Sequence, residues 1–484
     1  MKKDKPVFFQ PRVPKQGPPL KILRPYHART YLLISVKDID KFINYAIIIN
    51  KVRHPRVYTS PVSAYFHFIP TRNVKNINKH AALDLIRFSP GGISRVKLAN
   101  RMNITRAAVS MIINDLLESG VICETTNDRS GSGRPPINLS INPGRGLVAG
   151  IDMGATHMGA MIANCAAQVM EEKETLIDIA RGPAACIEEA DALLREVTEK
   201  AGARIEDLLA IGLGVPGPIQ AEAGMVVAPP IMPGWDRFPI RATLEKRWKR
   251  PVSLNNDAEL GAVGEWAYGA GRGVHNLAYI KVATGVGAGL LLDGHTYRGA
   301  TGSAGEIGHL TVDFDGELCT CGNRGCLETL ASGPAIARQA QRAVSAGQQT
   351  QLSLPNNGHS ITASEVASAA SQGDLLSQRI IAEAGEQLGI AIANLVNLIN
   401  PNMVVVGGSV AQIGDLFLEP VRREVQRRSL PASVRAVQIT TALLGNRSSL
   451  LGAVVQALSI GLHKIADQRG GAVKQDAARL AAAP

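Results

Sequence analysis

One histidine and three cysteines stand close together in the chain, in an order that suits a metal ion: His309, Cys319, Cys321 and Cys326. One imidazole and three thiolates complete the tetrahedral shell that zinc prefers, and they leave no position for a catalytic water. The turn at residues 321–326 is short and contains two glycines, so it can close around such an ion. The pattern predicts a structural Zn²⁺ site, and the alternative is a group of reduced cysteines that bind no metal.

Three short turns could bind phosphate, at residues 152–156, 283–289 and 407–409. Glycine lets the backbone approach a phosphate closely, and threonine hydroxyls and backbone N–H groups bind its oxygens. Each turn follows an apolar run, so together they predict a nucleotide-phosphate site, and the alternative is a set of ordinary tight turns. The candidate residues are Asp152, Gly154, Thr156, Thr284, Gly285, Gly287, Gly407 and Gly408.

Asp257 has two interpretations. It follows Asn256 and precedes a helical run at residues 258–268, so it could be the N-cap of that helix. A carboxylate there could also be a general base that takes the proton of a sugar hydroxyl as it attacks a phosphoryl group. The residues alone leave both interpretations open.

The elements that would position these residues follow an α/β pattern after Gly144. Short apolar runs that end in glycine-rich turns alternate with helical stretches. The predicted strands are residues 147–152, 210–213, 277–282 and 403–406, and the clearest predicted helices are residues 187–201 and 382–398.

Residues 76–145 are organised differently, as three short helices followed by two strands. Ser94 and Thr105 can cap the second and third helices, with a tight turn between them. Residues 121–125 and 137–141 have the pattern of strands on either side of a glycine- and arginine-rich tip. This order predicts an α+β winged helix-turn-helix domain, and the alternative is a helical protein-interaction module.

In a helix-turn-helix, the second helix of the turn enters the major groove with its N-terminal end. The face of that helix opposite its apolar stripe, together with the wing tip, could contact base edges and phosphates. The candidate DNA-binding residues are Thr105, Arg106, Ala107, Ser110 and Asn114 on the helix, and Arg129 and Arg134 in the tip.

The positive charge of the chain lies at its N-terminus. The net charge is +11, and residues 1–75 hold 15 Lys/Arg against 3 Asp/Glu. Such a segment can bind nucleic acid without sequence preference. We interpret it either as a disordered basic arm or as upstream sequence translated from a misassigned start. Residues 467–484 are alanine-rich and polar, which is typical of a flexible tail.

Cysteine usage and hydropathy indicate the cellular compartment. Six cysteines in 484 residues are few, and three of them share the metal-like spacing, which favours a reducing cytoplasm over a disulfide framework. No run of about 18 apolar residues predicts a membrane span, and no signal peptide is evident. We therefore expect a cytoplasmic protein with no membrane partner.

On these residues the chain resembles the ROK family (repressors, open reading frames, kinases). The resemblance covers about residues 76–466 and implies an α/β, actin-like, two-lobed sugar-kinase domain at 146–466, preceded by the winged helix-turn-helix. Segments that look like the family signatures are GEIGH at 305–309 and CTCGNRGCLE at 319–328, and IGLGVPGPI at 211–219 and NNDAE at 255–259 are similar to further family blocks.

The resemblance also implies roles for single residues. Asn256, Asp257, Glu306, His309 and Glu328 would contact a sugar, since carboxylates and an imidazole bind hydroxyl pairs directionally. Asp257 would be the catalytic base in those members that are kinases. His309 would also bind the zinc and so hold the sugar-binding loop in place.

The chain departs from the kinases of this family on the nucleotide side. Ala155 and Ala283 stand where those kinases usually have glycine, and His157 stands where Lys or Asn is common. Each added methyl narrows the approach to a nucleotide phosphate. The departures leave the sugar residues intact, which favours a sensor over an enzyme.

We therefore expect a homodimeric or homotetrameric regulator, a repressor of carbohydrate genes, whose affinity for operator DNA changes when a sugar or sugar phosphate binds. Its expected cofactor is structural Zn²⁺, with ATP and Mg²⁺ only if kinase activity is retained. One alternative is an ATP-dependent, glucokinase-like sugar kinase with an added DNA-binding domain. Another is a regulator that responds to a partner protein and has a vestigial sugar cleft.

Overall fold

The computed structural model describes residues 74–126, 137–229, 231–353 and 360–468. All of them belong to one compact unit, Tyr58–Pro484. The basic segment 1–75 lies outside the described residues except for its last two, and the tail 467–484 except for its first two.

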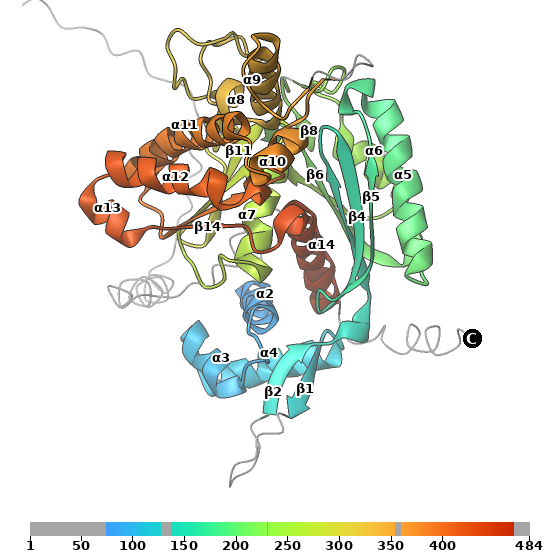
Figure 1. Ribbon diagram of the computed structural model, residues 1–484. Helices are drawn as coiled ribbons and strands as arrows, with labels where there is room; N and C mark the ends of the chain where they lie inside the picture. Colours follow the sequence, from blue (N-terminus) through green and yellow to red (C-terminus); the bar gives the residue numbers. More distant parts are fainter. Residues whose placement is uncertain (1–73, 127–136, 230, 354–359, 469–484) are drawn as a thin grey trace, which may run out of the picture. The chain divides into compact units, whose positions relative to one another are not determined.

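Three helices and a two-stranded antiparallel sheet begin the described chain (Figure 1). The predicted caps are present, because the Ser94 hydroxyl accepts a hydrogen bond from Lys97 N–H and the Thr105 hydroxyl accepts one from Ala108 N–H. Each cap satisfies an N–H group that a helix leaves unpaired at its start. The elements are α2 (Val74–Arg87), α3 (Arg95–Met102), α4 (Arg106–Glu118), β1 (Ile122–Thr126) and β2 (Ile137–Ile141). The wing tip, with the candidates Arg129 and Arg134, lies outside the described residues.

The first lobe is built on a five-stranded sheet with the strand order β5-β4-β3-β6-β9. The first three strands in that order are antiparallel, and β6 and β9 run parallel to β3. Helices α5 and α6 pack on one face and α14 on the other. The bounds are β3 (Leu147–Met153), β4 (His157–Asn164), β5 (Val169–Leu176), β6 (Leu208–Val215), β9 (Val252–Asn256), α5 (Pro183–Lys200), α6 (Ile240–Trp248) and α14 (Ser448–Asp467), with a small hairpin of β7 (Ile219–Gln220) and β8 (Met225–Val226).

The second lobe repeats this plan with the order β12-β11-β10-β13-β14. Three antiparallel strands are again followed by two that run parallel to the central one. Helix α7 packs on one face and the α9–α12 group on the other. The bounds are β10 (Leu277–Val282), β11 (Val286–Leu292), β12 (His295–Tyr297), β13 (Met403–Gly407), β14 (Gln438–Thr441), α7 (Asp257–Tyr268), α8 (Glu328–Ala331), α9 (Gly333–Ser345), α10 (Ala363–Ser371), α11 (Leu375–Ile399), α12 (Asp415–Arg428) and α13 (Pro431–Ala436).

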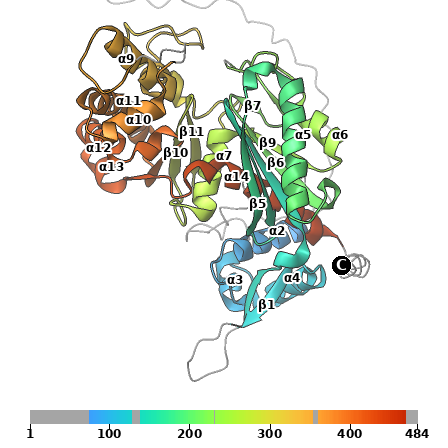
Figure 2. The same cartoon turned by 45° about the vertical axis from the view of Figure 1, so that its right-hand side comes forward.

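Helices α7 and α14 lie between the two sheets, as Figure 2 shows. They cross at backbone distance, because glycines stand at the crossing. A Cβ atom on Gly264 would lie 2.1 Å from the carbonyl oxygen of Ser448, and one on Gly452 would lie 1.9 Å from that of Leu260. Glycine is therefore required at both positions for the helices to approach this closely. Two sheets of one plan around a central helix pair form the actin-like arrangement.

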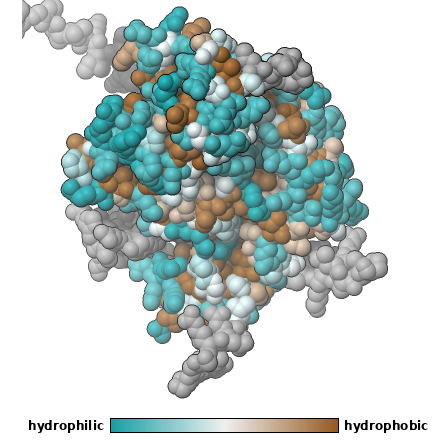
Figure 3. Space-filling view, viewed as in Figure 1, coloured by the Kyte–Doolittle hydropathy of each residue, from teal (hydrophilic) through white to brown (hydrophobic). Residues whose placement is uncertain are grey.

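Among the described residues, the helical stretch Gly445–Asp467 is long and apolar enough to cross a membrane by length and composition. However, 89% of its most apolar window is buried inside the protein, as expected of a core helix. On the face seen in Figure 3 the surface is mostly hydrophilic, with apolar residues in separate groups. The apolar character of α14 is thus accounted for by packing between the lobes.

Helix α2 packs along the C-terminal half of α14. Nε2 of His463 lies 3.1 Å from Oδ1 of Asp84, and Nε2 of His80 lies 2.9 Å from Oδ1 of Asp467. The rings of His80 and His463 are stacked, with centroids 4.1 Å apart and planes within 2° of parallel. The helix-turn-helix residues also share one apolar core with α14 and with the α14 side of the first sheet. Polar and apolar contacts therefore both join this segment to the first lobe.

Candidate functional site

A cavity of about 450 Å³ opens where strand ends of both sheets meet α7. It gathers twelve of the thirteen residues predicted for phosphate and sugar binding. They come from the ends of β3, β9 and β13, the turn between β10 and β11 with the start of β11, the start of α7, the 3₁₀ turn Ile307–His309 with the residue before it, and the start of α8. The twelve are Asp152, Gly154, Thr156, Asn256, Asp257, Thr284, Gly285, Gly287, Glu306, His309, Glu328 and Gly408.

Gly407 is the predicted phosphate residue that does not line the cavity. A Cβ atom there would lie 2.4 Å from the hydroxyl of Tyr279, so this glycine faces the core. The next residue, Gly408, has a φ of +87° and turns the backbone toward the cavity. Gly407 is thus required for close packing in the core, and Gly408 for the turn.

The interpretation of Asp257 as a helix N-cap is wrong. The N-cap of α7 is Asn256, whose Oδ1 accepts hydrogen bonds from the N–H groups of Ala258 and Glu259. The Asn256 amide also donates to the carbonyl of Gly217, so most of this side chain is engaged in holding the turn. Asp257 is the first residue of the helix, and its carboxylate faces the cavity.

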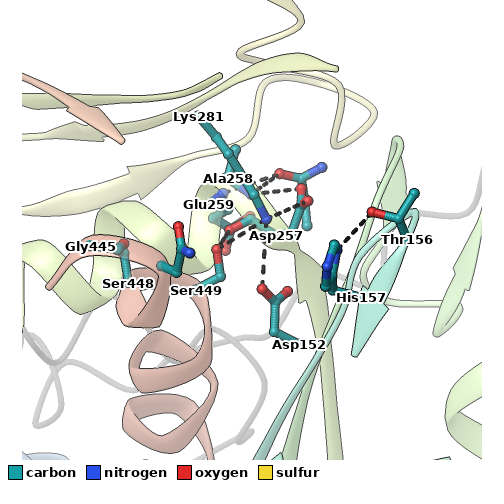
Figure 4. A network of polar contacts seen from close by, with 12 residues as sticks. Asp152, Thr156, His157, Asp257, Ala258, Glu259, Lys281, Gly445, Ser448 and Ser449 are labelled. Atoms are coloured by element: carbon teal, nitrogen blue, oxygen red, sulfur yellow. Dashed lines mark hydrogen bonds and ion pairs between the residues drawn. The ribbon is translucent and has the colours of Figure 1, made fainter. Parts of the chain in front are cut away.

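A buried lysine that the sequence analysis did not single out joins the two cavity aspartates (Figure 4). Nζ of Lys281, on β10, lies 2.9 Å from Oδ2 of Asp257 and 3.6 Å from Oδ2 of Asp152. Burial raises the pKa of Asp152 to about 6, although the Lys281 ammonium opposes this shift. Burial alone would lower the pKa of Lys281, but the two carboxylates raise it above its ordinary value. The sequence signal was a lone charge in an otherwise apolar strand.

Two glutamates face the same space from the second lobe. Glu328, at the start of α8, accepts a hydrogen bond of 2.9 Å from the N–H of Val286. Glu306 precedes the short 3₁₀ turn Ile307–His309, and burial raises its pKa. Together with Asp257, these carboxylates give the cavity an oxygen-rich side that is suited to hydroxyl groups.

The histidine and the three cysteines come together as predicted. One ligand atom from each of His309, Cys319, Cys321 and Cys326 lies within 4.8 Å of all the others. Sγ of Cys321 is 3.7 Å from Sγ of Cys326, and Sγ of Cys319 is 3.7 Å from Nδ1 of His309. Because His309 also lines the cavity, this cluster borders the candidate sugar site.

The predicted DNA-binding residues of α4 lie on its outer side. Arg106, Ala107 and Asn114 are exposed and Ser110 is half-buried. Of the predicted apolar stripe, Leu117 is half-buried and the other four residues are buried: Val109, Ile112, Ile113 and Leu116. The Ser110 hydroxyl donates to the carbonyl of Arg106, and the Asn114 amide oxygen accepts a long bond of 3.4 Å from Arg95. Among the described residues, the start of α4 therefore presents the exposed cation Arg106 to the outside.

Comparison with known proteins gives consistent matches. The model of the ROK family matches residues 148–459. The xylose repressor of Caldicellulosiruptor bescii is 33% identical over 386 residues, which cover 80% of this chain and 96% of that protein. The glucokinase of Halalkalibacterium halodurans is 36% identical over 306 residues, which cover 63% of this chain and 92% of that protein.

A solved structure extends the same likeness. The crystal structure of a ROK family transcriptional regulator, a homologue of the Escherichia coli Mlc protein, superposes with a TM-score of 0.69 at 28% identity. It covers 82% of this chain and 100% of that chain. The matches to the repressor and to the regulator are longer than the family match, so the likeness extends beyond residues 148–459.

Proposed function

The chain belongs to the ROK family, and on that basis we propose that it is a sugar-responsive transcriptional repressor. The helix-turn-helix of residues 76–145 binds operator DNA, and the cavity of residues 146–466 binds the sugar. The observation that carries the proposal is the physical joining of these parts: α14 borders the cavity with one end and holds α2 with the other. The likeness to a xylose repressor, which covers 80% of this chain and 96% of that protein, supports it.

Helix α14 is the element through which the cavity acts on the DNA-binding segment. At its N-terminal end, the Ser449 hydroxyl donates to the backbone carbonyl of Asp257, at 2.8 Å. Near its C-terminal end, His463 and Asp467 contact α2. A helix of this length spans about 30 Å, so α14 connects the cavity directly with α2. A sugar that favours one arrangement of the lobes therefore biases the placement of α2.

We propose that His309, Cys319, Cys321 and Cys326 hold a structural Zn²⁺. Ligands that are each about 2.0–2.3 Å from one tetrahedral ion lie between three and four ångströms apart, and the 3.7 Å separations fit this. The ion would fix the loop that carries His309 into the cavity. Free thiols, six in all, agree with a reducing compartment such as the cytoplasm.

The test begins with the full-length, zinc-loaded protein and a random DNA library. Sequences selected by binding are labelled, and their affinity is measured by fluorescence anisotropy while xylose, glucose and their phosphates are added. We expect one of these ligands to weaken binding about 5–150-fold, the usual range of allosteric coupling. Glu306→Gln should reduce the ligand response and keep DNA affinity, because Glu306 lies in the cavity and far from α4 in the chain.

Two outcomes would contradict the proposal. Selection without sequence enrichment would refute DNA-specific regulation, and unchanged affinity with every sugar and sugar phosphate would refute the effector.

We propose a homodimer or homotetramer, so the selected site should contain two half-sites spaced by about one helical turn or a multiple of it. The second candidate is a glucokinase-like kinase, favoured by the glucokinase match and by Asp257 in the cavity.

A further inference from the structure

Lys281 lies between two cavity carboxylates, which is an arrangement that could otherwise bind a divalent cation. In phosphoryl transfer, Mg²⁺, held by protein carboxylates, bridges the phosphates and neutralises their charge. Asp152 follows the buried part of β3 beside the first glycine turn, and Asp257 begins α7 on the opposite side of the same space. The ammonium of Lys281 occupies the gap between these two carboxylates (Figure 4).

The strand register explains why Lys281 points into this gap. Along β10, Ala278, Ile280 and Val282 pack into the outer core of the second lobe. Leu277 and Tyr279 pack on the other face, toward α7. Side chains alternate between the faces of a strand, so Lys281 must share the α7 face. Its side chain is 18% exposed, and each aspartate is 16% exposed, so water screens the contacts weakly.

Both carboxylate oxygens of Asp257 already have partners within the protein, so this carboxylate needs no metal ion to compensate it. Oδ2 of Asp257 receives the lysine, and its Oδ1 accepts the N–H of Ala258. Oδ1 of Asp152 is buried without a hydrogen-bond partner among the described residues. A divalent cation that approached this free oxygen would meet the ammonium at close range and be repelled.

We propose that Lys281 is a specificity-determining residue, whose ammonium replaces the divalent cation between Asp152 and Asp257 and so excludes Mg²⁺-nucleotide from the cleft. It holds the Asp257 carboxylate in a fixed position beside the sugar subsite. The cleft thereby binds a sugar without transferring a phosphoryl group to it. This inference rests on the proposed sugar-binding function of the same cavity.

The test compares wild type with Lys281→Met, which keeps the length of the side chain and removes its charge. Both proteins, zinc-loaded and full-length, are titrated with Mn²⁺, followed by electron paramagnetic resonance. We expect Lys281→Met to gain one Mn²⁺ site at least about tenfold tighter than any in wild type, because two facing carboxylates are then uncompensated. Ser449→Ala is the control: it removes a 3.4 Å contact of the same ammonium and the hydrogen bond to the Asp257 backbone carbonyl but keeps the charge of Lys281, so it should gain no site.

A second measurement on wild type alone keeps the inference open to refutation if the variant fails to fold. Calorimetric titration with Mg²⁺ and a non-hydrolysable ATP analogue should give no binding up to about 1 mM, the upper end of ordinary substrate affinities. Binding of that analogue by wild type would overturn the proposal, as would a folded Lys281→Met protein without a new Mn²⁺ site. Sugar binding is titrated separately. Absence of sugar binding would contradict the proposed function and would not affect the conclusion about the metal ion.

Discussion

Replacing His463 by alanine should destabilise the protein by about 1–3 kcal/mol, the usual cost of leaving a buried hydrogen-bonding group without its partner. The contact between His463 and Asp84 is almost completely buried, because their side chains are 3% and 2% exposed. The other carboxylate oxygen of Asp84 is buried without a partner among the described residues. In the variant the carboxylate would lose the contact that compensates its removal from water.

The assay is urea unfolding of the zinc-loaded protein, followed by circular dichroism. Lys173→Ala provides the control, because its ion pair with Glu196 is 43% and 39% exposed and such pairs contribute about 0–1 kcal/mol. His463→Gln restores an N–H donor and should recover part of the loss. Replacing both His463 and Asp84 by leucine should cost less than His463→Ala alone, since no buried charge is left unpaired.

Either of two results would show that the buried Asp84 carboxylate does not set the cost. A loss below about 1 kcal/mol for His463→Ala would place the contact in the class of surface pairs. A double leucine variant less stable than the single alanine variant would show that packing, and not the stranded carboxylate, sets the cost.

Three further predictions concern pH, metal and DNA. Burial and the neighbouring imidazole of His463 hold the pKa of His80 below its ordinary value of 6.5. As the pH falls below 6.5, the unfolded chain therefore takes up a proton at this residue more readily than the folded protein does. The free energy of unfolding in urea should fall from about pH 7 to about pH 5, and less steeply in His80→Asn. Cys321→Ser should lower both the zinc content, measured by atomic absorption, and the sugar affinity, and a wild type without zinc would contradict the site. Deleting residues 1–75 should flatten the salt dependence of DNA binding and keep operator preference. Arg106→Ala should weaken binding to the operator by about 1–3 kcal/mol more than binding to random DNA, whereas Arg134→Ala should weaken binding to both alike. Gel shifts at two salt concentrations measure these differences.

Local signals in the sequence were sufficient for much of the fold. Ser94 and Thr105 cap helices as predicted, because a capping hydroxyl acts on an N–H only three residues away. The strand predicted at residues 277–282 has these bounds in the structure, since its apolar run ends at a glycine turn. The family resemblance then supplied what such signals lack, namely the pairing of distant strands into two lobes.

The missed features depend on contacts between residues far apart in the chain. Asp257 was the N-cap candidate in the sequence, but Asn256, a capping residue of equal quality one position earlier, caps the helix. Lys281 lies 24 residues after Asp257 and meets it through the packing of β10 on α7. Its charge in an apolar strand was visible, but its partners follow from tertiary structure alone.

Helix α2 is positioned to respond to the angle between the lobes, because it contacts one helix from each. His80 and Asp84 hold it to α14, which packs on the sheet of the first lobe. Phe88, just past its end, packs against Trp266 and Tyr268 of α7, with ring centroids 5.1 and 6.4 Å away, and α7 packs on the sheet of the second lobe. Under the proposed function, a sugar that draws the lobes together shifts α7 against α14, and α2 must tilt between them. In the proposed dimer two copies would read two DNA half-sites, so even a small tilt in each would change their spacing and hence the operator affinity.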